Sequence, residues 1–307
     1  MDGLFQKYLR PKKIPSTACS GCGLGQVHKR VLLAIDGLGL GVQDVIWGTG
    51  IGCAGRQTFN AWKGDNFAGT HGRVYALAAG LRMALPKEKK IVLTVGDGDA
   101  FGIGLKHLLH CARRNLDMTV IVADNFGYQS TGGQFGLTTP PGAVTDSSPY
   151  GLSETGWLGP DLDVLEILKA AGATFLARHL SLDGKPSVDN LKLALLNPGF
   201  SLVHFIFPCV THFGAVSLAE RDKPLILSWF KSVFNPAYGQ DRGESFQKLK
   251  DRINPGFLKL KRGLYHDASG SRPDYSELLK AWTDTFRPDR AAPKEPGRAG
   301  SGEGAEP

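Results

Sequence analysis

Two carboxylates and two glycines follow the apolar run "KIVLTV", in the segment "GDGD" at 96–99. Carboxylates beside glycine at the end of a strand are typical of sites where the backbone approaches an anion with the help of a metal ion. A second polar segment, "ADNFGYQSTGGQ" at 123–134, follows the apolar run "MTVIV". One helical pattern separates the two segments. We therefore expect a βαβ unit whose parallel strands end at the same edge of one sheet.

The oxygen donors in these two segments predict a binding site for a divalent cation. Asp97 offers a carboxylate, Asn125 an amide oxygen and Gly127 a backbone carbonyl, which are the donors that Mg²⁺ prefers. The glycines let a diphosphate approach the backbone, and a helix from about Ile103 points its positive end toward it. Read separately, "GDG" and "DN" also fit simple turns. Their occurrence together at the ends of successive strands favours the cation site.

Four cysteines form a second group of candidate ligands. Cys19 and Cys22 lie in "TACSGCGLG", Cys53 in "GTGIGCAGR" and Cys209 in "FPCVTHFG". Neighbouring glycines let backbone N–H groups approach sulfur, as in iron–sulfur proteins, but four thiolates also fit structural zinc. A Cys-x-x-Cys alone fits a thioredoxin-like redox pair. The single, distant third and fourth cysteines favour a cluster, while the fifth, Cys111, is predicted to pack in the core.

Alternating strand and helix patterns predict an α/β fold, a parallel sheet with helices on both faces. In such sheets ligands bind at the carboxyl ends of the strands. The helix from Ile103 is predicted to end at Arg113 and Arg114, with Asn115 in a left-handed cap. The strands are expected at 44–50, 90–99, 118–125, 174–179 and 201–209, with further helices at 164–171, 188–196 and 224–234.

The chain is predicted to have three parts. Residues 1–215 read as the cofactor-binding domain with its cysteine ligands. Residues 216–287 read as a C-terminal extension that contacts a partner or covers the same domain. The end at 288–307, rich in Gly, Pro, Ala and charge, reads as a disordered tail.

Composition narrows the classes of function. The 307 residues carry a formal net charge of +7, which favours anionic partners such as phosphorylated cofactors and carboxylate substrates. The sequence shows no basic helix or stripe of the kind that binds nucleic acid. It also has no apolar run of membrane-spanning length. The first residues lack the features of a signal peptide. We therefore expect a cytoplasmic protein whose five cysteines are not disulfides.

The order of motifs, CxxCG, GIGC, THGR, GDGD, TGGQ and PC, resembles the β subunit of the 2-oxoacid:ferredoxin oxidoreductases, most closely the 2-oxoglutarate type. The resemblance covers roughly residues 15–215 and implies a thiamine diphosphate-binding fold. Two departures stand out. Asp124 occupies a position where the family usually has Asn, and Ser20 one where it often has Pro.

This resemblance assigns ligands and contacts residue by residue. It implies a 4Fe–4S cluster on Cys19, Cys22, Cys53 and Cys209, and Mg²⁺ on Asp97, Asn125 and Gly127. Candidate catalytic residues are His71 and Arg56, since Arg suits bidentate recognition of a substrate carboxylate. Thiamine diphosphate contacts are implied at Ile51, Gly52, Ala54, His71, Gly98, Asp99, Gln129, Ser130 and Thr131.

The implied activity is the coenzyme A-dependent oxidative decarboxylation of a 2-oxoacid, 2-oxoglutarate being favoured, with electrons passed to ferredoxin. Thiamine enzymes generally use a glutamate against the aminopyrimidine, and none lies in the motif segments here. We therefore expect an α subunit to supply it and this chain to be active only with that subunit. The alternatives are a cluster-free thiamine diphosphate decarboxylase or transferase, and a zinc-stabilised electron-transfer or interaction subunit.

Overall fold

The computed structural model describes residues 2–13, 17–140, 142–151, 163–234, 244, 253 and 261–286. The predicted tail at 288–307 lies outside them. The elements in chain order are α1 (Asp2–Tyr8), η1 (Pro11–Lys13), α2 (Leu24–Gly37), β1 (Val45–Thr49), α3 (Cys53–Ala61), β2 (Asn66–Ala68), α4 (Val74–Ala84), β3 (Lys90–Gly96), η2 (Gly98–Ile103), α5 (Leu105–Arg113), β4 (Met118–Asp124), η3 (Gln129–Thr131), α6 (Val164–Ala171), β5 (Phe175–Leu180), α7 (Lys185–Leu196), β6 (Phe200–Ile206), η5 (Phe213–Ser217), α8 (Lys223–Phe234), β7 (Gly263–Asp267) and α10 (Tyr275–Phe286).

The strands of the described residues form one sheet in the order β2-β1-β3-β4-β6-β5-β7. All neighbours pair in parallel except β5 and β7, which are antiparallel. The five predicted strands and the parallel α/β fold are confirmed. The short strands β2 and β7 were not predicted, because neither "NFA" nor "GLYHD" is an apolar run and both lie at the sheet edges.

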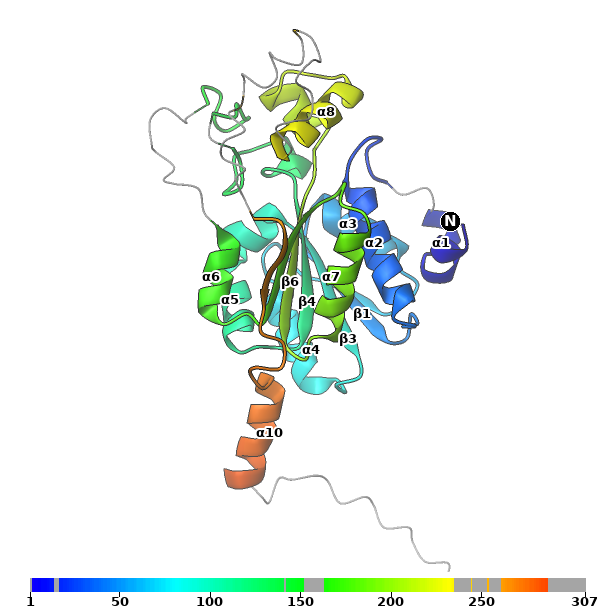
Figure 1. Ribbon diagram of the computed structural model, residues 1–307, viewed down its shortest axis with the longest axis vertical. Helices are drawn as coiled ribbons and strands as arrows, with labels where there is room; N and C mark the ends of the chain where they lie inside the picture. Colours follow the sequence, from blue (N-terminus) through cyan, green and yellow to red (C-terminus); the bar gives the residue numbers. More distant parts are fainter. Residues whose placement is uncertain are drawn as a thin grey trace, which may run out of the picture.

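Helices cover both faces of the sheet (Figure 1). One core cluster joins the buried residues of α4, α5 and α6 to one face, and another joins those of α1, α2 and α7 to the other. Along β3, Ile91 and Leu93 belong to the first cluster and Val92 to the second. Strands buried on both faces need apolar residues at successive positions, which explains the continuous apolar runs.

The β3–α5–β4 unit sets the position of the acidic loops. Gly96 pairs with Ala123, so the residues that follow them leave the sheet side by side. The helix predicted from Ile103 begins at Leu105, after a wider π-helical turn over Gly98–Ile103. Its predicted end is confirmed, because Asn115 takes a left-handed conformation with φ of 49°.

The segment after β6 returns over the carboxyl end of the sheet. Ile226, Trp229 and Phe230 of α8 are buried against Val210 and Phe213. Helix α10 extends from the opposite end of the molecule (Figure 1). The separation of 216–287 as a partner-contacting extension stays a prediction. Within the described residues, no helix is long and apolar enough to span a membrane.

Cys111 provides a test of the core assignment. Its side chain is 3% exposed in the cluster around α5, and burial raises the pKa of its thiol to about 12. We expect Cys111→Ala to lower the free energy of unfolding by about 1 kcal/mol, since only one buried heavy atom is lost. Leu108→Ala, on the same helix, should cost about 3 kcal/mol. Urea unfolding followed by circular dichroism measures the free energy of unfolding of both variants. Equal losses in the two variants would contradict the assignment of Cys111 as a small core residue.

Candidate active site

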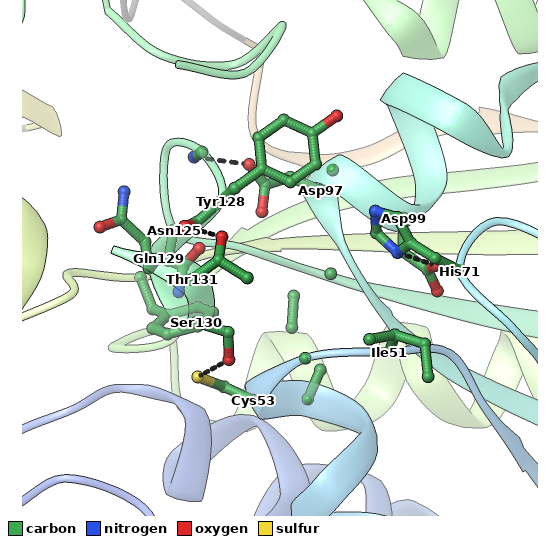
Figure 2. A pocket seen from close by; sticks show the side chains of 17 residues that line it. Ile51, Cys53, His71, Asp97, Asp99, Asn125, Tyr128, Gln129, Ser130 and Thr131 are labelled. Carbon is green, nitrogen blue, oxygen red and sulfur yellow. Dashed lines mark hydrogen bonds and ion pairs between the residues drawn. The ribbon is translucent and has the colours of Figure 1, made fainter. Parts of the chain in front are cut away.

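A cavity of about 230 Å³ opens at the carboxyl ends of the strands (Figure 2). Its walls come from the loops after β1, β2, β3 and β4 and from Phe207 after β6. The structure brings together here every residue that the sequence assigned to the cofactor. The predicted residues that line it are Ile51, Gly52, Cys53, Ala54, His71, Asp97, Gly98, Asp99, Asn125, Gly127, Gln129, Ser130 and Thr131.

The predicted cation ligands converge on one another. Gly127 N–H and Thr138 Oγ1 donate to Asp97 Oδ2 over 2.7 and 2.8 Å, which leaves Asp97 Oδ1 free to face Asn125. The facing amide atom of Asn125 lies 3.3 Å from Asp97 Oδ1 and 3.2 Å from the Gly127 carbonyl oxygen. As nitrogen, that atom would donate to both oxygens. As oxygen, it completes a set of three acceptors, which a bound cation would satisfy.

The two separations around Asn125 are compatible with Mg²⁺ if the amide oxygen is the atom that faces Asp97. In an octahedron with metal–oxygen bonds of about 2.1 Å, neighbouring ligand oxygens lie roughly 3.0 Å apart, close to the separations around Asn125. Among the described residues, no three His, Cys, Asp or Glu side chains are grouped to hold one metal ion. The candidate site therefore has a single carboxylate, and its other protein ligands are the amide and the backbone carbonyl.

Asp124 is buried beside Asp97, and the two share a donor. The Thr138 hydroxyl lies 2.8 Å from Asp97 Oδ2 and 2.9 Å from Asp124 Oδ1. Burial raises the pKa of both carboxyls, and the charge of Asp124 raises that of Asp97 further. Two adjacent buried carboxylates repel each other unless positive charge or hydrogen-bond donors compensate.

A chain of side chains supplies donors to Asp124. Arg178 Nε donates to His204 Nδ1 over 3.2 Å, which leaves the imidazole proton on Nε2 for Asp124 Oδ2 at 2.9 Å. Arg178 Nη2 in turn pairs with Asp163 Oδ1 at 2.6 Å. Burial and the neighbouring guanidinium lower the pKa of His204, so the imidazole stays neutral. The chain explains how the carboxyl of Asp124 is accommodated at this buried position.

His71 and Asp99 form a pair on the opposite wall of the cavity (Figure 2). His71 Nδ1 lies 2.7 Å from Asp99 Oδ1, which also accepts from Gly72 N–H. Burial raises the pKa of Asp99, and these two partners oppose that rise. Gly50 makes room for the carboxylate, since a Cβ there would lie 1.4 Å from Asp99 Oδ2. Asp99 therefore orients the His71 ring at the cavity wall.

Tyr128 lines the cavity and was not predicted from the sequence. Its ring lies against the GDGD turn, where a Cβ on Gly98 would come within 2.3 Å of Tyr128 Cε1. A Cβ on Gly102 would come equally close to the hydroxyl, at 2.3 Å. The glycines of this turn thus accommodate an aromatic ring. A tyrosine in a glycine-rich loop has no spacing signal, so only the structure identifies it.

A second cavity, of about 190 Å³, is lined by Cys19, Cys22, Cys53 and Cys209. Burial, with smaller contributions from the charges of the other three cysteines, raises the pKa of Cys22 to about 12. The Cys22 thiol therefore stays protonated unless a metal centre supplies positive charge. The structure thus brings the four predicted cysteine ligands to the wall of one cavity, and a cluster bound there stays a prediction.

Glycines fold the Cys-x-x-Cys segment against the sheet. Cys22 N–H donates to Cys19 carbonyl oxygen over 2.9 Å, and Gly21 between them has φ of 88°. A Cβ on Gly23 would come within 2.5 Å of Phe207 Cβ. Glycine at this position therefore lets the loop pack beside the chain that leads to Cys209.

The two cavities share a wall. Cys53, Asn125, Gln129 and Ser130 line both. Gln129 Oε1 is buried without a hydrogen-bond partner, as expected of a group that a bound molecule would satisfy. Arg56 lines the cysteine cavity and does not line the first one, so its predicted pairing with a substrate carboxylate stays a prediction.

Comparison with known proteins gives consistent matches. The family model described as thiamine pyrophosphate enzyme, C-terminal TPP binding domain, matches residues 50–205. The 2-oxoglutarate synthase subunit KorB of Methanocaldococcus jannaschii is 36% identical over 83% of this chain and 92% of its own length. A 2-oxoacid:ferredoxin oxidoreductase subunit beta from a Sulfolobus species is 31% identical over 86% of this chain and 85% of its own.

A solved structure extends the similarity to the fold. It is the 2-oxoglutarate:ferredoxin oxidoreductase from Magnetococcus marinus with 2-oxoglutarate, coenzyme A and succinyl-CoA bound. It is 27% identical, has a TM-score of 0.72, and the match covers 92% of this chain and 90% of that one.

Asp97 tests the cation site. We expect Asp97→Ala to abolish Mg²⁺-dependent binding of thiamine diphosphate, because the variant lacks the only carboxylate of the predicted ligand set. Calorimetry with the partner subunit present measures the affinity, and circular dichroism checks that the fold is intact. Asp117→Ala, which removes a carboxyl at the start of β4 far from the cavity, is the control. Unchanged affinity in Asp97→Ala would rule out this assignment.

The pH dependence of binding tests the same site differently. Burial and Asp124 raise the pKa of Asp97 to about 8, so protons compete with the cation below that pH. We expect Mg²⁺-dependent cofactor affinity to fall from pH 8 to pH 6, with protons released on binding. Without the cation, the folded protein holds a proton on Asp97 more tightly than the unfolded chain does, because the pKa is raised from 3.8 to about 8. The free energy of unfolding should therefore fall as the pH rises through this range. Calorimetry in buffers of different ionisation enthalpy and thermal melts measure both trends.

Proposed function

Because the chain belongs to the family of 2-oxoacid:ferredoxin oxidoreductase β subunits, within the thiamine pyrophosphate enzymes, we propose that it forms the cofactor-binding half of such an enzyme. It holds thiamine diphosphate, Mg²⁺ and a 4Fe–4S cluster, and acts in the coenzyme A-dependent oxidative decarboxylation of a 2-oxoacid. The observation that carries the proposal is the shared wall of Cys53, Asn125, Gln129 and Ser130 between the two cavities.

The residues present suit the diphosphate end of the cofactor. The oxygens of Asp97, Asn125 and Gly127 would hold Mg²⁺, and the backbone at Gly98 leads into the turn before α5, whose N-terminus favours phosphate. When bound, thiamine diphosphate supplies a nucleophilic carbon that adds to the 2-oxoacid carbonyl and allows CO₂ to leave. His71, held by Asp99, would position or move a proton at the cavity wall.

The shared wall suits electron transfer from the cofactor to the cluster. Electrons would leave the first cavity past Cys53 and Ser130 to a cluster on the four cysteines, and then pass to ferredoxin. The single, distant third and fourth cysteines favour a cluster over structural zinc, whose cysteine ligands usually come as two close pairs. Purified protein distinguishes the two, since a cluster contains iron and sulfide and absorbs broadly in the visible range.

The composition of the cavity supports a role for a partner subunit. Among the described residues that line it, none is a glutamate, the group that thiamine enzymes use against the aminopyrimidine. Glu166, on α6, accepts a hydrogen bond from the Tyr265 hydroxyl. Glu154 lies outside the described residues. An α subunit would therefore complete the site and contribute to the pocket for the 2-oxoacid and coenzyme A. The names of the relatives favour 2-oxoglutarate as substrate, and a cytoplasmic location stays a prediction.

Activity of the isolated chain tests this assembly. We expect the purified β chain to contain iron and to bind thiamine diphosphate, yet to reduce no viologen dye with any 2-oxoacid and coenzyme A. Adding the α subunit should raise the rate of dye reduction at least about a hundredfold above the background of the isolated chain. Replacing that subunit's glutamate should return the rate to this background. Light scattering and anaerobic handling confirm that the isolated chain is monodisperse with its cluster intact. Turnover by the isolated chain would refute a site shared between subunits.

Iron content tests the four ligands separately from activity. Cys209→Ala should lose most of the iron and sulfide, because one corner of the cluster loses its thiolate. Cys111→Ala should retain wild-type iron, since that thiol lies in the core. Iron lost from the second variant and kept in the first would mean that the ligand set is wrong.

A further inference from the structure

Hydrogen-bonding groups lie against three of the four cysteine sulfurs. Ser130 Oγ is 3.0 Å from Cys53 Sγ, and Thr211 Oγ1 is 3.3 Å from Cys209 Sγ. Cys22 receives a backbone hydrogen bond from Leu24. Two of the three contacts thus come from side-chain hydroxyls, which can be removed without changing the backbone.

The direction of the hydrogen bond at Ser130 follows from its other partner. Arg56 Nη2 donates to Ser130 Oγ over 3.2 Å, and a guanidinium has no acceptor. The oxygen therefore accepts from Arg56, and its own proton is available for Cys53. A thiolate that is bound to a metal has no proton to donate, so in that state the hydroxyl must be the donor. Arg56 thus orients an O–H···S hydrogen bond.

Ser130 occupies the boundary between the two cavities. It lies in the 3₁₀ turn Gln129–Thr131, opposite the first residue of α3, Cys53 (Figure 2). Arg56 follows Cys53 by one helical turn, so one short helix provides both the sulfur and the guanidinium. Both Cys53 and Ser130 line both cavities. The hydrogen bond therefore acts on the sulfur that lies nearest to the thiamine cavity.

We propose that Ser130, held by Arg56, and Thr211 are positioning residues that raise the reduction potential of the cluster. The inference rests on the proposed function, since it requires a cluster on these cysteines. One-electron reduction adds negative charge that spreads onto the ligand sulfurs. A hydrogen-bond donor at sulfur stabilises the more negative state, which makes the cluster a better electron acceptor. No bond to Ser130 or Thr211 forms or breaks.

Hydroxyl deletions in the assembled α–β complex test the proposal. Redox titration with dithionite, followed by the electron paramagnetic resonance signal of the reduced cluster, measures the potential of each variant. We expect Ser130→Ala to lower the one-electron reduction equilibrium constant about tenfold, a shift of about −59 mV. Thr211→Val should shift the potential in the same direction by less, because its contact is longer. Ser130→Thr, which keeps the hydroxyl, should stay near the wild type.

Ser20→Ala is the matched control. Ser20 lies between two of the ligands, Cys19 and Cys22, and among the described residues no hydrogen bond joins its hydroxyl to a cysteine sulfur. Its removal should leave the potential unchanged. If Ser130→Ala assembles no cluster, Thr211→Val still shows whether loss of a hydroxyl lowers the reduction potential. Its potential is then compared with those of Ser130→Thr and Ser20→Ala.

The outcomes separate this inference from the proposed function. Wild-type potentials in both Ser130→Ala and Thr211→Val, with full iron content, would overturn the inference and leave the proposed function intact. A wild-type complex without iron and sulfide would overturn the proposed function and this inference with it. Equal shifts in Ser20→Ala and Ser130→Ala would also overturn the inference, because a general change of the cluster loop would then explain both.

Discussion

Two carboxylates buried side by side determine how the carboxyl end of the sheet is built. The parallel pairing of Gly96 with Ala123 places Asp97 and Asp124 next to each other, where burial raises the pKa of both. Such an arrangement is unfavourable without compensation. Compensation comes from Thr138 between the carboxylates and from His204 behind Asp124. On the cavity side, a divalent cation at Asp97 would supply the remaining positive charge.

The chain from Asp163 through Arg178 and His204 extends this compensation from the loop before α6 to the centre of the sheet. Arg178 and His204 lie on β5 and β6 in register with each other, so the hydrogen bond between them is set by strand pairing. Fold and candidate site thus depend on the same contacts. A change at Arg178 would disturb the sheet and the surroundings of the cation together, and for that reason the smaller hydroxyl contacts are better probes of function.

The cysteine cavity is assembled differently, from segments that are not neighbours in the sequence. Its four cysteines come from three segments, the loop before α2, the start of α3 and the turn after β6, which meet only because all lie at the same end of the sheet. Glycine at position 23 allows the first segment to approach the third at Phe207. Cys53 and Ser130 lie in the wall that this cavity shares with the first one, so a cluster and a cofactor bound as proposed would be separated only by short polar contacts.

Sequence alone was sufficient for the α/β fold, the five long strands and most of the residues that line the first cavity. Apolar runs report burial directly, and the strand-end motifs lie at the edge where parallel strands place their ligands. The short edge strands β2 and β7, the ring of Tyr128 against Gly98, the chain behind Asp124 and the contact of Ser130 with Cys53 depended on tertiary structure. The contacts among them join residues far apart in the chain, through side-chain directions that no local spacing encodes.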